Sequence, residues 1–212
     1  MDAGRTRNPV NLSRDLAQTR EFFSPRAAGW EDRHPDDDVL FRWAVEQLGL
    51  SAGDAAIDAG CGSGRALAPL RAAVGPEGAV LGIDATPAML HEAARLGRRS
   101  ISVCAIGDVR RLPVRDGCAA GILAAGLLPH LPDAVGVLRE MARVARPGGR
   151  LGVFHPIGRL ALAARHRDRG AGAHDMNIDP RRIGPLLAAG GWTLEVLDDA
   201  DDHYLALAVC GG

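Results

Sequence analysis

Three glycines stand two residues apart in the stretch AIDAGCGSG, at Gly60, Gly62 and Gly64. A short apolar run, Ala55 to Ala59, leads into them and is typical of a buried strand. Glycine allows turns that other residues avoid and lets a ligand approach the backbone closely. A glycine-rich loop directly after a strand therefore predicts a binding site for a nucleotide-like ligand.

Two features of the sequence argue against the commonest ligands of such a loop. The chain contains no lysine, so its 25 basic residues are all arginine. A phosphate loop of the nucleotide-hydrolysing type requires a lysine on the phosphates. The dinucleotide fingerprint requires a glycine where this chain has Arg65. A nicotinamide-dependent oxidoreductase is therefore the disfavoured alternative.

Two acidic residues follow later strands of the pattern. Asp84 ends the strand predicted at Ala79 to Ile83, and a carboxylate there can accept hydrogen bonds from both hydroxyls of a ribose. Its alternative role is that of an acid at a helix N-terminus. Asp108 follows the strand predicted at Ile101 to Ala105, where it can accept from an adenine amino group while the Val109 amide donates to the ring. Its alternative is a turn acid.

Two histidines are candidates for a general base. His155 ends the strand predicted at Arg150 to Phe154, so it should face the mouth of a cleft at the strand ends. Its alternative role is to fix the turn into Pro156. His130 follows the strand predicted at Ala119 to Ala124 and lies between a proline and a leucine, where simple loop packing is equally consistent with the sequence.

Length and charge restrict the classes of protein. At 212 residues the chain is expected to form a single domain, and its net charge of −1 argues against a nucleic-acid partner. The polar start predicts no signal peptide, and the longest apolar run, Cys118 to Leu128, is too short to span a membrane. The four scattered cysteines show no metal-ligand spacing. We expect a cytoplasmic monomer or homodimer with no membrane partner and no metal.

Strand and helix patterns alternate along the chain up to residue 154. Such alternation predicts a parallel sheet with helices on both faces, which is a Rossmann-like three-layer α/β sandwich. The end of the chain differs, with a helix predicted at Arg181 to Ala189 and strands at Trp192 to Leu197 and His203 to Val209. A short loop joins these two strands, so they must be antiparallel.

These motifs, in this order, resemble the class I S-adenosylmethionine-dependent methyltransferases, in the group that methylates quinones and other small molecules. The likeness runs from about Trp30 to Phe154 and rests on five stretches: AIDAGCGSG, VLGIDATPAML, GDVRRLPVRDG, ILAAGLLPHLPD and EMARVARPGGRL. The resemblance implies a seven-stranded, mostly parallel sheet with an antiparallel last strand. It also implies S-adenosylmethionine as the cofactor and a small-molecule methyl acceptor as the partner.

The resemblance assigns parts of the cofactor to particular residues. It places the glycine loop on the methionine part, with Asp58 holding the ammonium, Asp84 the ribose, and Asp108 with Val109 the edge of the adenine. The full set that it implies for the cofactor is Asp58, Ala59, Gly60, Cys61, Gly62, Asp84, Ala85, Met89, Gly107, Asp108, Val109 and Ala125, with Trp30 added from the N-terminal segment.

The N-terminal stretch REFFSPRAAGWEDR carries aromatic residues that a core helix does not need. It reads as a short helix broken at Pro25, and we expect it to act as a lid, with Trp30 or Phe23 covering the sulfonium. The alternative is a helix packed on the sheet. We thus divide the domain into residues 1–50 with the lid, a cofactor-binding core at 51–154 and a substrate-side segment at 155–212, within which 158–179 is the least regular part.

Methyl transfer from a sulfonium is an in-line displacement, so the protein mainly supplies position and desolvation. A base, His155 or His130, is needed only when the accepting atom carries a proton. The pocket predicts a small, partly apolar acceptor. The strand at Ala119 to Ala124 offers no polar side chain, and this favours a second hypothesis, a regulatory or inactive protein that binds S-adenosylmethionine without consuming it.

Overall fold

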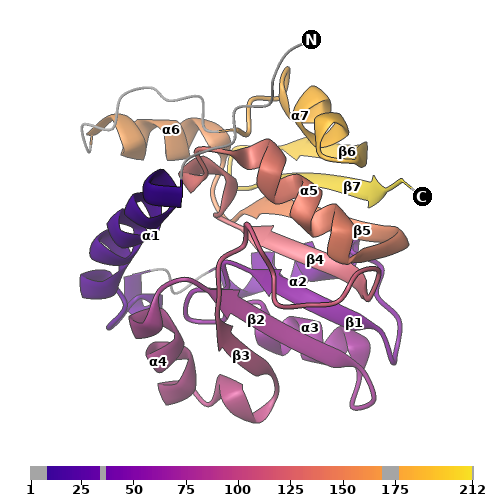
Figure 1. The fold of residues 1–212 in the computed structure, drawn as a ribbon, viewed down its shortest axis with the longest axis horizontal. Helices are drawn as coiled ribbons and strands as arrows, with labels where there is room; N and C mark the ends of the chain where they lie inside the picture. Colours follow the sequence, from indigo (N-terminus) through magenta and orange to yellow (C-terminus); the bar gives the residue numbers. More distant parts are fainter. Residues whose placement is uncertain (1–8, 34–36, 169–176, 212) are drawn as a thin grey trace.

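One sheet organises the part of the chain that the computed structural model describes, residues 9–33, 37–168 and 177–211. Its order is β3-β2-β1-β4-β5-β7-β6, as Figure 1 shows. The strands are β1 (Ala55–Ala59), β2 (Ala79–Asp84), β3 (Val103–Ile106), β4 (Ala119–Ala125), β5 (Ala145–His155), β6 (Trp192–Asp199) and β7 (Tyr204–Cys210). The first five run parallel, and β7 is antiparallel to both of its neighbours. The predicted seven-stranded, mostly parallel sheet is confirmed.

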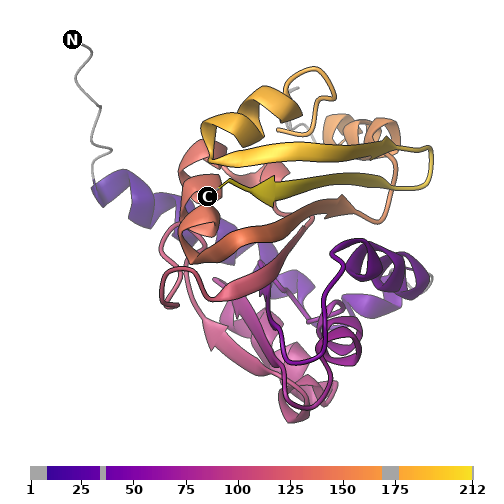
Figure 2. The ribbon, with the colours of Figure 1, turned by 90° about the vertical axis from the view of Figure 1, so that its right-hand side faces the viewer.

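Helices cover both faces of this sheet and give the predicted three layers (Figure 2). They are α1 (Pro9–Phe23), α2 (Asp38–Gln47), α3 (Leu67–Val74), α4 (Pro87–Arg95), α5 (Ala134–Val144), α6 (Arg159–Asp168) and α7 (Ile183–Ala189), with short 3₁₀ turns η1 (Ser24–Arg26), η2 (Glu31–Arg33), η3 (Arg98–Ser100) and η4 (Leu128–His130). One buried apolar cluster joins the sheet to α5 and α7, and a second joins it to α2 and α3.

The chain order creates a crevice between β1 and β4. The first three strands are added outward from β1, and the chain then returns to place β4 on the other side of β1. Loops that leave β1 and β4 therefore diverge, and ligands bind at such a point, beyond the carboxyl ends of the strands. In Figure 1, α1 lies beside this edge of the sheet, between α4 and α6.

Two prolines lie within regular elements, and one expectation is corrected by the structure. Pro69 lies in the first turn of α3, which begins at Leu67, so its missing N–H would have no partner in the helix. Pro147-Gly148-Gly149 lies within β5, where the pairing with β4 is irregular. The stretch 158–179 is less irregular than expected, since it contains α6, while residues 169–176 lie outside the described part.

None of the helices in the described part of the chain has the length and apolar composition that a membrane crossing requires.

His203 ties the turn before β7 to α2. Its ring packs against Trp43 with ring centroids 4.5 Å apart, and its Nδ1 lies 2.7 Å from the Asp202 carboxylate. Its Nε2 lies 3.2 Å from the Asp198 carboxylate. Burial alone would lower the pKa of His203, but the hydrogen bonds to Asp198 and Asp202 outweigh it and raise the pKa.

We predict a pH-dependent loss of stability for His203→Gln. A raised folded-state pKa stabilises the protein fully below the unfolded-state pKa of about 6.5, and this contribution disappears as pH rises through the folded-state value. Chemical denaturation should therefore show a larger deficit for the variant at pH 6 than at pH 9. His91→Gln, at an exposed position of α4, is the control. A deficit that is equal at the two pH values would contradict the prediction.

Candidate active site

A cavity of about 1120 Å³ lies at the carboxyl ends of the strands. It brings together predicted site residues that are up to 125 positions apart in the sequence, from Trp30 to His155. The predicted site residues that line it are Trp30, Asp58, Gly60, Cys61, Gly62, Asp84, Ala85, Met89, Asp108, Val109, Ala125, His130 and His155.

Ala59 and Gly107 are the predicted site residues that are not among the lining residues. Ala59 is fully buried in the apolar cluster on the α5 side of the sheet. Gly107 packs against Ile83, where a Cβ would lie 2.8 Å from the nearest methyl group. Both residues therefore pack behind the wall of the cavity, whereas residues next to them in the chain line it.

The glycines of the loop have different surroundings. A Cβ on Gly64 would lie 2.6 Å from the Leu67 side chain and 2.9 Å from that of Arg98, so this position has no room for a side chain. A Cβ on Gly62 would meet nothing within 4 Å, and Gly62 lines the cavity. Gly64 is therefore needed for packing, whereas Gly62 leaves open space in which a ligand can approach the backbone.

Asp84 holds this loop and still has accepting capacity. Its Oδ2 accepts from the Gly62 N–H at 2.9 Å, and its Oδ1 accepts from the Thr86 N–H at 2.7 Å. Burial raises the pKa of Asp84, and the two backbone hydrogen bonds oppose this effect. Each carboxylate oxygen can accept about two hydrogen bonds. Asp84 therefore still has acceptor positions for the two hydroxyls of a ribose.

Asp58 lies deeper, at the end of β1. Its side chain is buried, and burial raises its pKa to about 7, with a further upward contribution from Asp84 and a downward one from Arg98. A buried carboxylate of this kind gains from a positive ligand group placed next to it. Asp58 therefore suits the ammonium end of a ligand that lies along the glycine loop.

Asp108 is already engaged by a neighbour. Both of its carboxylate oxygens accept from the Arg110 Nε, at 2.9 and 2.8 Å, and Oδ1 also accepts from the Arg110 backbone N–H. The side chain still lines the cavity beside Val109. Any hydrogen bond from an adenine amino group would have to share this carboxylate with Arg110.

Aromatic residues form the outer wall. Phe23 lies at the end of α1, with ring-centroid distances of 5.9 Å to Trp30 and 5.3 Å to His130. The Nε of Arg20 donates to the Ala85 carbonyl at 2.7 Å, which ties α1 to the β2–α4 connection. The expected break at Pro25 is present, since α1 ends at Phe23 and η1 follows. The segment thus lies against the cavity, as a lid would.

His155 lines the cavity from the end of β5. His155 is half-buried. A Cβ added at Gly126 would lie 3.7 Å from its Cε1 and Nε2, so the glycine leaves open space next to the imidazole ring. His130 is exposed by comparison. The two histidines face the same cavity from β5 and from η4.

Cys61 does not have the properties of a nucleophile. The thiol is buried, and burial together with Asp58 and Asp84 raises its pKa well above the ordinary range, so it stays protonated. Within the described residues, no group of three or more histidine, cysteine or carboxylate side chains could hold a metal ion.

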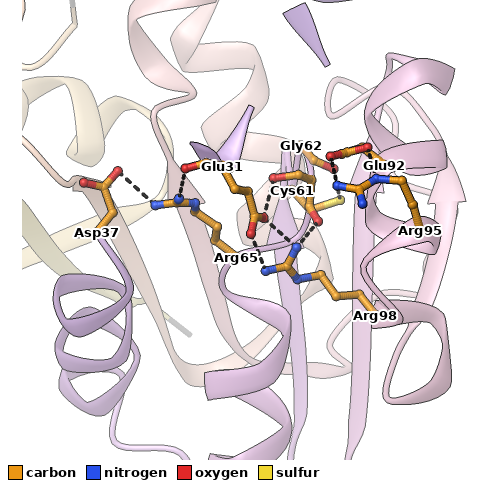
Figure 3. Close-up of polar contacts among 9 residues, drawn as sticks. Glu31, Asp37, Cys61, Gly62, Arg65, Glu92, Arg95 and Arg98 are labelled. Atoms are coloured by element: carbon orange, nitrogen blue, oxygen red, sulfur yellow. Dashed lines mark hydrogen bonds and ion pairs between the residues drawn. The ribbon is translucent and has the colours of Figure 1, made fainter. Parts of the chain in front are cut away.

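Sequence reasoning missed the polar residues that fasten the N-terminal segment. Glu31 and Arg98 meet beside the glycine loop (Figure 3), although 67 positions separate them. The hydroxyl of Ser63, in the loop itself, donates to Glu31. No periodicity or local motif indicates a pair so far apart in the chain. Arg65, which served only to exclude a dinucleotide, is also buried there and lies 3.2 Å from Asp37.

Comparisons with known proteins agree with this geometry. Residues 57–153 match the family model described as a methyltransferase domain. Demethylmenaquinone methyltransferase from Shouchella clausii is 35% identical over 111 residues, which are 50% of this chain and 47% of the relative. The 2-phytyl-1,4-naphtoquinone methyltransferase from Synechococcus elongatus is 36% identical over 118 residues, 53% of this chain and 50% of the relative. The chain spans no more than about half the length of such curated relatives.

Solved structures extend the likeness to the whole fold. A chain from the complex between the Haloferax volcanii Trm112 methyltransferase activator and a methyltransferase superposes with a TM-score of 0.72, at 20% identity, over 91% of this chain and 97% of the other. The match identifies residues 57–153 as a methyltransferase domain, and the fold around them agrees with the expected class I S-adenosylmethionine-dependent type. The expected family is confirmed, and S-adenosylmethionine is the cofactor of this class.

We predict opposite effects of Asp58→Asn on binding and on stability. Asparagine cannot offer a charge to the ligand ammonium, so calorimetry at pH 8 should show S-adenosylmethionine binding about tenfold weaker, or about 1.4 kcal/mol. The unfolded chain ionises near 3.8 and the folded protein near 7, so wild-type stability falls as pH rises between these values. The variant avoids this loss, and its melting temperature relative to wild type should be higher at pH 8 than at pH 5. Unchanged binding together with unchanged stability would contradict this reading of Asp58.

We also predict weaker cofactor binding for Trp30→Ala. A cation lying against an aromatic face in a desolvated site gains up to about 2 kcal/mol, so the affinity measured by calorimetry should fall about tenfold. Trp43→Ala is the matched control, because Trp43 packs on His203 outside the cavity. Equal affinities of the two variants would remove Trp30 from the cofactor site.

Proposed function

We propose that this protein transfers the methyl group of S-adenosylmethionine to a small, partly apolar, quinone-like molecule. The observation that carries the proposal is one cavity with two different parts. One part is lined by Asp58, Gly62 and Asp84, and the other by apolar and aromatic side chains together with two histidines: Leu16, Phe22, Phe23, Leu127, His130, Leu131, His155, Ile157 and Leu162.

The size of the cavity supports two ligands. Its volume of about 1120 Å³ lies above the roughly 300–1,000 Å³ typical of a site for one small ligand. The cofactor half offers an open backbone at Gly62, a carboxylate with spare acceptor capacity at Asp84 and a buried carboxylate at Asp58. These three features fit a ribose and an ammonium group. The apolar half then has room for a flat acceptor.

The cofactor supplies an activated methyl group, whose sulfur leaves with the bonding electron pair when the acceptor atom attacks. The chain orients the acceptor and excludes water. Where the attacking oxygen or ring carbon carries a proton, that proton must go to a base, and His155 fits this role because it borders the cavity at the end of β5. The aromatic wall formed by Phe23 and Trp30 would keep the reaction dry.

The class of acceptor is suggested by the relatives. Two of them carry names that specify a quinone, demethylmenaquinone and 2-phytyl-1,4-naphtoquinone. A flat aromatic ring with a hydroxyl group also suits an apolar wall that ends in a histidine. We infer that this chain takes an acceptor of the same chemistry, a hydroxylated aromatic ring in its reduced form.

The direct test is a methyl-transfer assay with isotopically labelled S-adenosylmethionine and reduced 1,4-naphthoquinones, with the product identified by mass spectrometry. Labelled product would support the proposal. Cofactor that binds but is never consumed, over a broad pool of hydroxylated aromatic molecules, would instead support a protein that binds S-adenosylmethionine without turnover. The absence of a polar side chain at Ala125 and Gly126, where β4 ends, is the feature that favours that alternative.

We predict that His155→Gln lowers kcat about 100-fold, the usual scale of general base catalysis, and leaves cofactor affinity unchanged. His130→Gln is the matched comparison, since His130 borders the same cavity from η4. A loss of kcat in the His130 variant alone would transfer the role to His130, and full activity in both would exclude a histidine base.

A further inference from the structure

The N-terminal segment is fastened to the glycine loop by one carboxylate. Glu31 Oε1 lies 2.5 Å from Arg98 NH1 and accepts from the Ser63 hydroxyl at 2.9 Å, while Oε2 accepts from Arg98 NH2 at 3.0 Å. Arg98 NH1 also donates to the Ser63 carbonyl at 3.0 Å. Figure 3 shows Glu31 and Arg98 pointing toward one another beside the loop. Three segments that are remote in sequence thus share one set of hydrogen bonds.

This contact differs from an ordinary surface ion pair. The side chains of Arg98 and Glu31 are only 15% and 21% exposed, and the guanidinium contacts the carboxylate with two nitrogens. Bidentate geometry and partial burial make such an ion pair stronger and more directional than an exposed one. By contrast, Arg95 and Glu92 pair within helix α4, with Arg95 65% exposed (Figure 3).

A second contact supports the first one. Arg65, buried two residues before α3, donates through Nη2 to the Glu31 carbonyl at 3.1 Å and lies 3.2 Å from Asp37, which directly precedes α2. Both arginines therefore hold Glu31, one by its side chain and the other by its backbone. Trp30 is the residue directly before Glu31 and lines the cavity.

We propose that Glu31, Arg98 and Ser63 form a latch that closes the segment Phe23–Glu31 over the bound cofactor. Glu31 and Arg98 are positioning residues in this proposal, which rests on the proposed binding of S-adenosylmethionine. Ser63 belongs to the glycine loop itself, so a ligand that orders the loop also orders the partner of Glu31. Closure in turn holds Trp30, and through its ring contact Phe23, against the cavity.

Coupling of this kind works in both directions. If closure strengthens cofactor binding by some factor, the cofactor strengthens closure by the same factor. The segment would open when the latch breaks, and the aromatic wall would move away from the site with it. The latch therefore controls both entry of the cofactor and the shape of the acceptor side, where Phe23 also contacts His130.

Glu31→Gln is the sharpest variant, because it removes the charge but leaves Arg98 in place to act on Asp58. Hydrogen exchange of residues 23–33 should be faster in this variant without any ligand, and S-adenosylhomocysteine should bind about tenfold more weakly and leave faster, within the usual range of coupling factors. Glu195→Gln is the matched control, since Glu195 pairs with Arg150 at an exposed position on β6. The control should match wild type in both measurements.

Arg98 variants provide an independent arm. Arg98→Gln should behave like Glu31→Gln, Arg98→Lys should restore part of the affinity, and the double variant should lose little more than either single one. Arg146→Gln is the arginine control, because Arg146 pairs with Asp54, away from the N-terminal segment. The latch is overturned if wild type binds S-adenosylhomocysteine and the Glu31 and Arg98 variants bind it as well as their controls, with unchanged exchange. Failure of wild type to bind the ligand overturns the proposed function instead, and with it the role of the latch.

Discussion

The hydrogen bond from the Gly62 N–H to the Asp84 carboxylate is the contact on which the site depends. Together with the Gly60 and Cys61 amides, which donate to the Ile83 carbonyl at 2.8 and 3.0 Å, it fixes the loop after β1 to the end of β2. The same carboxylate binds the Thr86 N–H at the start of α4. One side chain therefore sets the positions of the loop, the second strand and the following helix relative to one another.

The sequence predicted those parts of the protein that follow from short-range pattern. An apolar run between turns marks a buried strand, and β1 begins and ends where the run Ala55–Ala59 does. Because the carboxyl ends of parallel strands meet at one edge, the residues after each strand could be collected into one site without knowledge of distances. This rule fails at Ala59, where the side chain belongs to the buried cluster instead.

The remaining features of the fold and the site depend on long-range contacts, which no local sequence pattern predicts. The pair of Arg98 with Glu31 forms only because the fold brings η2, η3 and the glycine loop together, and neither residue stands out in its own stretch of sequence. The irregular start of β5 at Pro147-Gly148-Gly149 likewise depends on pairing with β4. By contrast, Asp108 and Arg110 are two positions apart, so their ion pair could have been considered from the sequence.

The two carboxylates at the ends of β1 and β2 also explain why the site must be supported from elsewhere. Burial raises the pKa of both Asp58 and Asp84, and Asp84 raises that of Asp58 further, so ionising both costs free energy in the folded protein. A ligand with an ammonium and a sulfonium would relieve this cost and stabilise the folded state by mass action. Until a ligand binds, the apolar clusters on both faces of the sheet must offset this free-energy cost. Trp192 lies in the larger of the two clusters, far along the sheet from the site. It is buried, and its Nε1 donates to the Leu138 carbonyl. Apolar packing on both faces of the sheet, including that of β1 and β2 themselves, thus lets the acidic site exist without unfolding the domain.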